Sequence, residues 1–234
     1  MKKFISLALV AFVLTAVSAA AMPTGNSYKS RNYVVNSSDL SRWTVGYFSD
    51  KRDRFVLLPS RTTMVSANQM LYIGYDIIPE IMLYGVIGDT DTRFGSRPFY
   101  NDTSYAAGLR IGLLDEDIME TMEMEDRVRL TATFQHGWFS SIYRNNEIEW
   151  KETYGSLVAS VVNDIEGNKM FFPKAIAIYA GLIYSDLDDS SVVEKKKTGF
   201  TYGLEFYFGE KISMDLGVDR IDNESYRTGF QLRF

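Results

Sequence analysis

The stretch Tyr226-Arg227-Thr228-Gly229-Phe230-Gln231-Leu232-Arg233-Phe234 decides the fold. Its apolar and aromatic side chains occupy every second position, starting at Tyr226, and Arg227, Gly229, Gln231 and Arg233 fill the positions between them. A period of two is typical of a β-strand, because successive side chains point to opposite faces. The stretch therefore predicts a strand with one aromatic face and one polar face.

The same alternation recurs upstream, for example in 104–114, 199–208 and 211–219. In 199–208 the side chains of Phe200, Tyr202, Leu204, Phe206 and Phe208 share one face. Either a soluble sandwich or a transmembrane barrel fits this period, since only the position of the apolar face differs between them. Segments of about ten residues favour the membrane, because globular strands average roughly 5–6 residues and membrane-crossing strands need roughly 9–11.

Ten strands follow from the pattern, an even number as bacterial single-chain barrels have. They are predicted at 42–49, 63–76, 80–89, 104–114, 127–139, 149–163, 173–185, 198–208, 211–221 and 225–234. Connections 77–79, 115–126, 164–172 and 209–210 are expected on the periplasmic side. Connections 50–62, 90–103, 140–148, 186–197 and 222–224 are expected outside. In 115–126, methionines between acidic residues suggest a short helix. In 149–163 the alternation is irregular, which suggests a β-bulge. Eight strands are the alternative count.

Composition excludes several kinds of chemistry. The chain is 46% hydrophobic, 24% charged and 14% aromatic, with no cysteine and one histidine. A disulfide scaffold, a thiolate zinc site, a cysteine nucleophile and a multi-histidine metal site are therefore ruled out. The mean hydropathy of -0.13 is too polar for a bundle of membrane helices.

The first 21 residues have the layout of a secretory signal peptide. Lys2 and Lys3 precede an apolar run, and Ala19-Ala20-Ala21 offers a small-residue cleavage site. We expect 22–41 to be an exposed N-terminal segment and 42–234 to be the barrel. Without Lys2 and Lys3 the net charge of -5 becomes -7, which argues against a nucleic-acid partner.

The terminal strand resembles the C-terminal strand of bacterial outer-membrane barrels, and the stretch from Tyr72 to Gly85 resembles the hairpins of the OmpA-like and opacity-type barrels. The resemblance implies a closed antiparallel up-and-down barrel in the cell outer membrane. It also implies that Phe230, Leu232 and Phe234 form the signal read by the barrel assembly machinery. The expected partners are outer-membrane lipid and lipopolysaccharide, the expected state is a monomer, and no cofactor or metal is predicted.

Charged residues on the polar faces are the candidate lumen-lining groups. They are Arg110, Arg127, Arg129, Glu205, Asp215, Asp219, Arg227 and Arg233, and a turn centred near Asn223 places Asp219 opposite Arg227. Buried charges must be paired or hydrated. The set therefore predicts a structural network that fills the lumen, with a narrow gated polar pathway as the functional alternative.

Catalytic motifs are weak. By parity His136 lies on the apolar face, where it is expected among interfacial aromatics. The pair Asp89 and Asp91 resembles the paired acids of omptin-type proteases, but no Asp-x-His motif accompanies it. Ser140 is four residues from His136, which is not a contact spacing on a strand. The run Lys195-Lys196-Lys197 is interpreted as a solvated loop that could touch lipopolysaccharide.

The sequence thus predicts an outer-membrane barrel with a structural or surface-interaction role. A narrow porin-like channel is the alternative function, an outer-membrane hydrolase ranks last, and a soluble lipocalin-like binder is the non-membrane rival.

Overall fold

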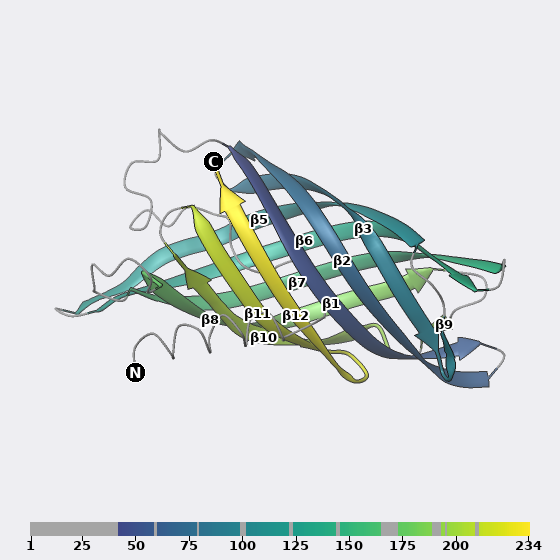
Figure 1. The fold of residues 1–234 in the computed structure, drawn as a ribbon. Helices are drawn as coiled ribbons and strands as arrows, with labels where there is room; N and C mark the ends of the chain where they lie inside the picture. The colour runs from purple at the N-terminus through teal and green to yellow at the C-terminus, as the bar shows by residue number, and fades with distance from the viewer. Residues whose placement is uncertain are drawn as a thin grey trace, which may run out of the picture.

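The computed structural model describes residues 42–58, 60–78, 80–98, 102–121, 124–143, 146–164, 173–188, 193–194, 196–208 and 211–234. The predicted signal peptide and N-terminal segment lie outside these ranges. Long antiparallel strands wind around a barrel at a steep tilt (Figure 1). No helix in the described ranges is both long and apolar enough to cross a membrane.

Ten long strands and two short ones are present in the described part of the chain. The long strands are β1 (Trp43–Leu58), β2 (Ser60–Ile78), β3 (Ile81–Phe94), β5 (Asp102–Thr121), β6 (Met124–Tyr143), β7 (Asn146–Asp164), β8 (Ala175–Asp188), β10 (Thr198–Tyr207), β11 (Ile212–Arg220) and β12 (Glu224–Arg233). The short ones, β4 (Arg97–Pro98) and β9 (Val193–Glu194), pair with β3 and β1. All ten predicted strands exist, so the eight-strand alternative is wrong.

The barrel closes through β1 and β12. Their antiparallel register runs from Thr44 opposite Arg233 to Lys51 opposite Tyr226. We call the end where β1 begins and β12 ends the proximal end, and the opposite end the distal end.

Several predicted connections are in fact strand. The hairpin β5–β6 reaches Thr121 and Met124, so the predicted helix in 115–126 is wrong. Cross-strand hydrogen bonding carries both strands onward, with register shifts between Gly112 and Leu114 and between Asp117 and Met119. At the distal end β1, β2, β3, β6, β7 and β8 also run further than predicted. The bulge expected in 149–163 is absent, because the registers of β7 with both neighbours are continuous.

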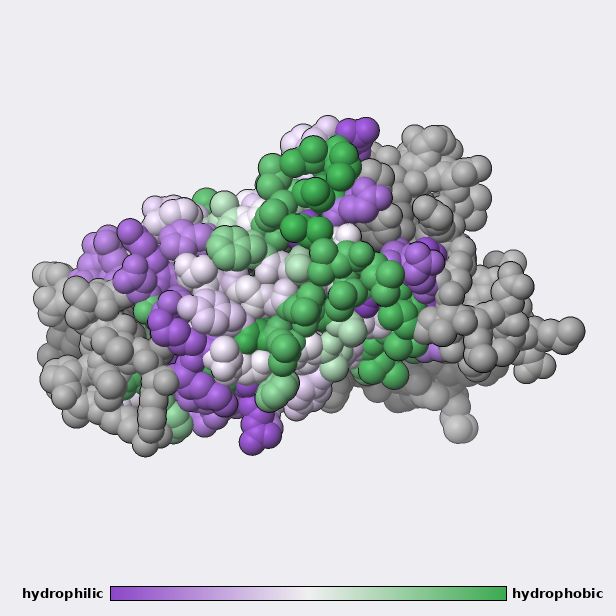
Figure 2. Space-filling model, turned by 180° about the vertical axis from the view of Figure 1, so that it is seen from behind, coloured by the Kyte–Doolittle hydropathy of each residue, from purple (hydrophilic) through white to green (hydrophobic). Residues whose placement is uncertain are grey.

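The terminal strand shows the predicted division of faces. Arg227, Gly229, Gln231 and Arg233 are buried inside the barrel, whereas Tyr226, Phe230 and Phe234 are exposed on its outer surface. Other exposed apolar side chains, including Leu71, Ile87 and Leu182, complete an outer apolar band. This band crosses the middle of the molecule in Figure 2 and gives way to hydrophilic surface on the left.

Aromatic side chains border the apolar band on both sides. Trp43, Tyr75, Phe208 and Phe234 form the proximal belt, and Tyr105, Trp138, Tyr184 and Tyr226 form the distal belt. Amphipathic rings at two levels around an apolar band are the pattern of a transmembrane barrel. The outer surface therefore matches a lipid environment between the belts.

Beyond the distal belt the outer face changes from apolar to charged. The outer surface there carries Lys51, Asp53, Asp89, Asp91, Glu149, Lys151 and Asp188. The interior carries a packed apolar cluster that includes Val56, Met64, Phe94, Phe139, Trp150 and Leu187. We call this part of the strands the distal extension. Its interior combines this apolar cluster with buried polar and charged side chains.

Inside the membrane-spanning part, large rings lie against glycines. A Cβ atom on Gly46 would meet the Tyr72 ring and the Phe230 carbonyl oxygen, and one on Gly217 would meet Tyr179 and Arg227. The missing side chains thus leave the space that the inward rings occupy.

Replacing Gly46 by alanine should lower the free energy of unfolding by about 1–3 kcal/mol, the usual cost of overpacking a filled interior. Gly85→Ala is the matched control, since its Cβ would meet nothing within 4 Å. Urea titration of the two variants folded in the same lipid vesicles measures the difference. Equal stabilities would contradict the packing described for Gly46.

Candidate functional site

The candidate site is the charged interior of the barrel. The structure places all eight predicted lumen residues there with little solvent exposure: Arg110, Arg127, Arg129, Glu205, Asp215, Asp219, Arg227 and Arg233. They come from β5, β6, β10, β11 and β12, and they lie in separate groups. Their burial is observed, whereas a role in transport stays a prediction.

Arg227 is the centre of the first group. Its Nε donates to Asp215 Oδ1 at 2.8 Å and its Nη1 to Asp219 Oδ1 at 3.2 Å. The residue opposite Arg227 is Gly217 rather than Asp219, so the ion pair with Asp219 is diagonal. Tyr179 on β8 accepts from Arg227 Nη2 at 2.5 Å, and its ring lies beside the guanidinium. One arginine therefore ties together three strands.

A second group closes the interior towards the proximal end. Arg129 on β6 donates to the Tyr207 hydroxyl at 3.0 Å, and that hydroxyl donates to Glu205 at 2.7 Å on β10. Asp115 on β5 accepts from both Arg127 and Arg129. These contacts reach across the lumen from β6 to β10.

Arg233 forms a third contact near the seam between the first and last strands. Its guanidinium pairs with Asp76 on β2. Because β1 lies between β12 and β2, this ion pair spans the closure.

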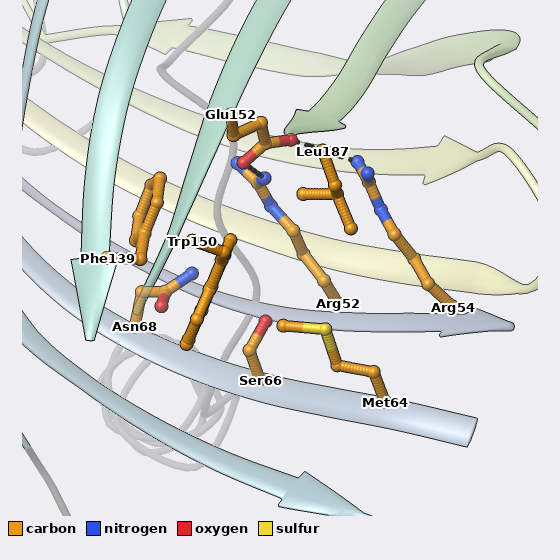
Figure 3. Close-up of a pocket in the computed structure, with 9 residues that line it drawn as sticks. All are labelled: Arg52, Arg54, Met64, Ser66, Asn68, Phe139, Trp150, Glu152 and Leu187. Carbon is orange, nitrogen blue, oxygen red and sulfur yellow. Dashed lines mark hydrogen bonds and ion pairs between the residues drawn. The ribbon is translucent and has the colours of Figure 1, made fainter. Parts of the chain in front are cut away.

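Another charged cluster was not predicted from the sequence. Arg52 and Arg54 project inward from β1, and Glu152 projects inward from β7 on the opposite wall (Figure 3). Asp50 of β1 is buried beside them. Glu152 pairs with Arg52 and lies 3.1 Å from Nη2 of Arg54. Arg52 Nε also lies 3.1 Å from Asp50 Oδ2. We call these four residues the distal cluster.

Neighbouring polar groups complete the distal cluster. The Asn68 amide donates to Asp50, and the Ser185 hydroxyl accepts from Arg54 at 2.9 Å and donates to Glu152. Glu152 lies in the distal extension, beyond the belt. Burial by itself would raise the pKa of its carboxyl, but the charges of Arg52 and Arg54 outweigh burial and lower the pKa to about 2. Glu152 is therefore ionised throughout the physiological pH range.

Little space remains beside the distal cluster. The cavity lined by Arg52, Met64, Phe139, Trp150 and Leu187 has a volume of about 10 Å³, which is the room needed by about one water molecule. The charged groups and the apolar cluster thus leave little free volume in this cavity.

The membrane-spanning lumen contains buried polar atoms without a protein partner. Thr44, Tyr72 and Gln231 are buried, and their side-chain polar atoms have no hydrogen-bond partner among the described residues. The Tyr72 hydroxyl lies among the charges of Arg110, Asp76, Glu205 and Asp215. Buried polar groups without protein partners are usually satisfied by ordered water. This level of the barrel is therefore suited to hold water.

The residues of the weak catalytic motifs do not form a common site. His136 faces outward, where Nδ1 lies 3.0 Å from Thr153 Oγ1 and its ring meets Trp138 edge-on. Ser140 donates instead to Asp102 at 2.6 Å. Asp89 and Asp91 are exposed on the outside, with buried Thr90 between them. No group of three or more histidines and acids among the described residues is arranged to hold a metal ion.

Two further predicted features concern the surface. In the basic run, Lys195 lies outside the described residues, and Lys197 pairs with Asp186. Phe230 and Phe234 are exposed on the outer face and Leu232 is half-buried there. Their part in assembly remains a prediction.

Solved structures with a similar fold are bacterial outer-membrane proteins. An outer-membrane channel from Pseudomonas putida F1 is 10% identical at a TM-score of 0.40, covering 83% of this chain and 96% of its own. The translocator domain of the autotransporter NalP from Neisseria meningitidis is 11% identical at a TM-score of 0.39, covering 87% and 94%. The Acinetobacter baumannii protein Omp33 is 11% identical at a TM-score of 0.27, covering 83% and 99%. No protein-family model and no curated protein matches the sequence.

Truncating Glu152 to alanine should destabilise the protein by about 3–5 kcal/mol, because it removes the carboxylate shared by two buried guanidiniums. Urea unfolding in vesicles measures the loss. Exposed Glu149→Ala, on the same strand, should change stability by less than about 0.5 kcal/mol. The quadruple variant Asp50→Asn/Arg52→Met/Arg54→Met/Glu152→Met should recover much of the loss, because it removes every charge of the distal cluster together. A Glu152→Ala variant as stable as Glu149→Ala would contradict the cross-lumen role.

Proposed function

We propose that the protein is an integral barrel of the bacterial outer membrane, closed to free diffusion, that acts through its outward surface as a structural or surface-interaction protein. The contact between Arg52 and Glu152 across the lumen carries this proposal. The apolar band between two aromatic belts supports the membrane location. The proximal end would face the periplasm and the distal extension the exterior.

The contents of the distal extension support the proposal of a closed lumen. Phe139 stacks on Trp150 with ring centroids 5.7 Å apart, and Leu187, Met64 and Phe94 belong to the same apolar cluster. An open pore needs a continuous water-filled path, whereas a packed apolar cluster together with paired charges excludes water. The extension is therefore suited to present a rigid surface rather than to conduct solutes.

A narrow gated pathway is the second candidate function. The unpartnered polar groups of Thr44, Tyr72 and Gln231 favour it, since they indicate a hydrated level inside the membrane-spanning part. Passage would require the distal cluster and the apolar cluster to separate. A catalytic role has the least support, because His136 faces outward and contacts Thr153.

Export and assembly complete the proposal. Residues 1–21 would direct secretion, and the assembly machinery would recognise the last strand through Phe230, Leu232 and Phe234. The full-length protein should fractionate with the outer membrane, and its mobility on a gel should shift on boiling. A protein recovered in the soluble periplasmic fraction would overturn the membrane assignment.

Conductance separates the two candidate functions. We expect the wild-type protein to give no steady current in a planar bilayer, because the distal extension blocks the lumen. The triple variant Arg52→Ser/Arg54→Ser/Glu152→Ser should show frequent openings, since the ionic contacts across the lumen are gone. The outward triple variant Lys51→Ser/Asp53→Ser/Lys151→Ser is the control and should remain silent. Steady current through the wild-type barrel would favour the channel.

A further inference from the structure

A second site lies on the outer surface at the distal belt. A pocket of about 380 Å³ is lined on the outer faces of β5, β6 and β7 by Thr103, Tyr105, Trp138, Ser140, Glu149 and Lys151, and Asp188 of β8 joins them. Its volume falls within the roughly 300–1,000 Å³ of small-molecule sites. We call it the belt pocket. Phe139 and Trp150 also line it, and the same two residues line the cavity beside the distal cluster.

One wall of the belt pocket is aromatic and held in place by its neighbours. The rings of Tyr105 and Trp138 stack with centroids 5.2 Å apart and planes 21° apart. The His136 ring packs edge-on against Trp138, and its Nδ1 is bonded to Thr153. A ring platform fixed in this way loses little conformational entropy when a ligand stacks on it.

The other walls offer hydrogen-bonding groups of both kinds. Ser140 and Thr103 supply hydroxyls, Glu149 and Asp188 supply acceptors, and the Lys151 ammonium supplies donors. The side chains of Glu149, Lys151 and Asp188 form no ion pair or hydrogen bond with the described residues, although Lys151 and Asp188 are opposite one another in the β7–β8 register. Their charged groups are thus available to a ligand.

The balance of charges selects the ligand class. Two carboxylates disfavour a phosphate or another anion, and the Lys151 ammonium, opposite Asp188 in the register, offsets one of the two negative charges. A neutral sugar ring matches both walls, since its C–H face is apolar and its hydroxyl edge both donates and accepts hydrogen bonds. Resting on the outer-membrane location proposed above, we propose that the belt pocket binds a neutral saccharide. The saccharide could be part of a membrane glycolipid or a free oligosaccharide, because the pocket opens outward just beyond the apolar band.

Binding can be measured with the full-length barrel in lipid nanodiscs. The probes are a neutral hexose oligosaccharide and a glycolipid that carries the same sugars, and the lipid without sugars serves as the blank. Quenching or shift of tryptophan fluorescence, together with isothermal calorimetry, reports binding. We expect saturable binding of at least one sugar-bearing probe and none of the blank. The free and lipid-linked probes identify the source of the sugar.

Variants locate the binding. Tyr105→Ala should weaken it at least tenfold by removing half of the stack, and Glu149→Gln should weaken it severalfold without disturbing the fold. Tyr226→Ala is the matched control, since Tyr226 is 52% exposed and Tyr105 is 53% exposed in the same belt. The gel-mobility shift on boiling checks that each variant is folded, so a failed membrane assignment is distinguishable from a failed pocket.

Several results would overturn the proposal. These are no binding of either sugar probe, equal binding of the blank lipid, equal losses in Tyr105→Ala and Tyr226→Ala, or binding of tetramethylammonium or inorganic phosphate in place of sugar. Binding of one sugar-bearing probe that is lost in Tyr105→Ala and kept in Tyr226→Ala would support it.

Discussion

Backbone hydrogen bonding between β1 and β12 is the constraint on which the rest of the structure depends. An unpaired strand edge in hydrocarbon would leave amides and carbonyls without partners, at a cost of several kcal/mol each. The register from Thr44–Arg233 to Lys51–Tyr226 removes that edge. Closure then limits the interior of a barrel of this size, so that inward side chains must share a confined space. The polar and aromatic packing of the lumen follows from this limit.

Ion pairs inside the barrel reinforce the closure. Arg233 on β12 reaches Asp76 on β2 across the intervening β1, and Arg227 ties β12 to β11 and β8. Removing charges from water is costly, and such pairs contribute little net stability compared with apolar packing. Their partners are at fixed positions, however, so a strand that slipped by one residue would turn Arg227 towards lipid. We therefore interpret these pairs mainly as determinants of register.

The sequence predicts features that depend on local periodicity and misses those that depend on distant contacts. The number of strands and the face of each side chain in the terminal strand were predictable, because alternation with a period of two is independent of context. The run from Lys51 to Arg54 has four consecutive charged residues and resembles a loop, yet it continues β1. Its pairing with Glu152 depends on the tilt of the whole barrel, which no local pattern specifies. The acids and methionines of 115–126 likewise resemble a helix, but cross-strand pairing outweighs that local preference.

The change of the outer surface from apolar to charged at the distal belt connects the fold to the proposed role. Between the belts, lipid solvates the outer apolar residues such as Leu71 and Ile87, so the interior can be polar. Beyond the distal belt the solvent is water, and the hydrophobic effect favours the apolar cluster of Phe139 and Trp150 inside. The outer face of the same strands thus changes from apolar to charged at the distal belt, while the inner face carries apolar and polar side chains on both sides of it. Because its core does not require lipid, the distal extension is held by its own packing, and a surface fixed on such a core is suited to recognition.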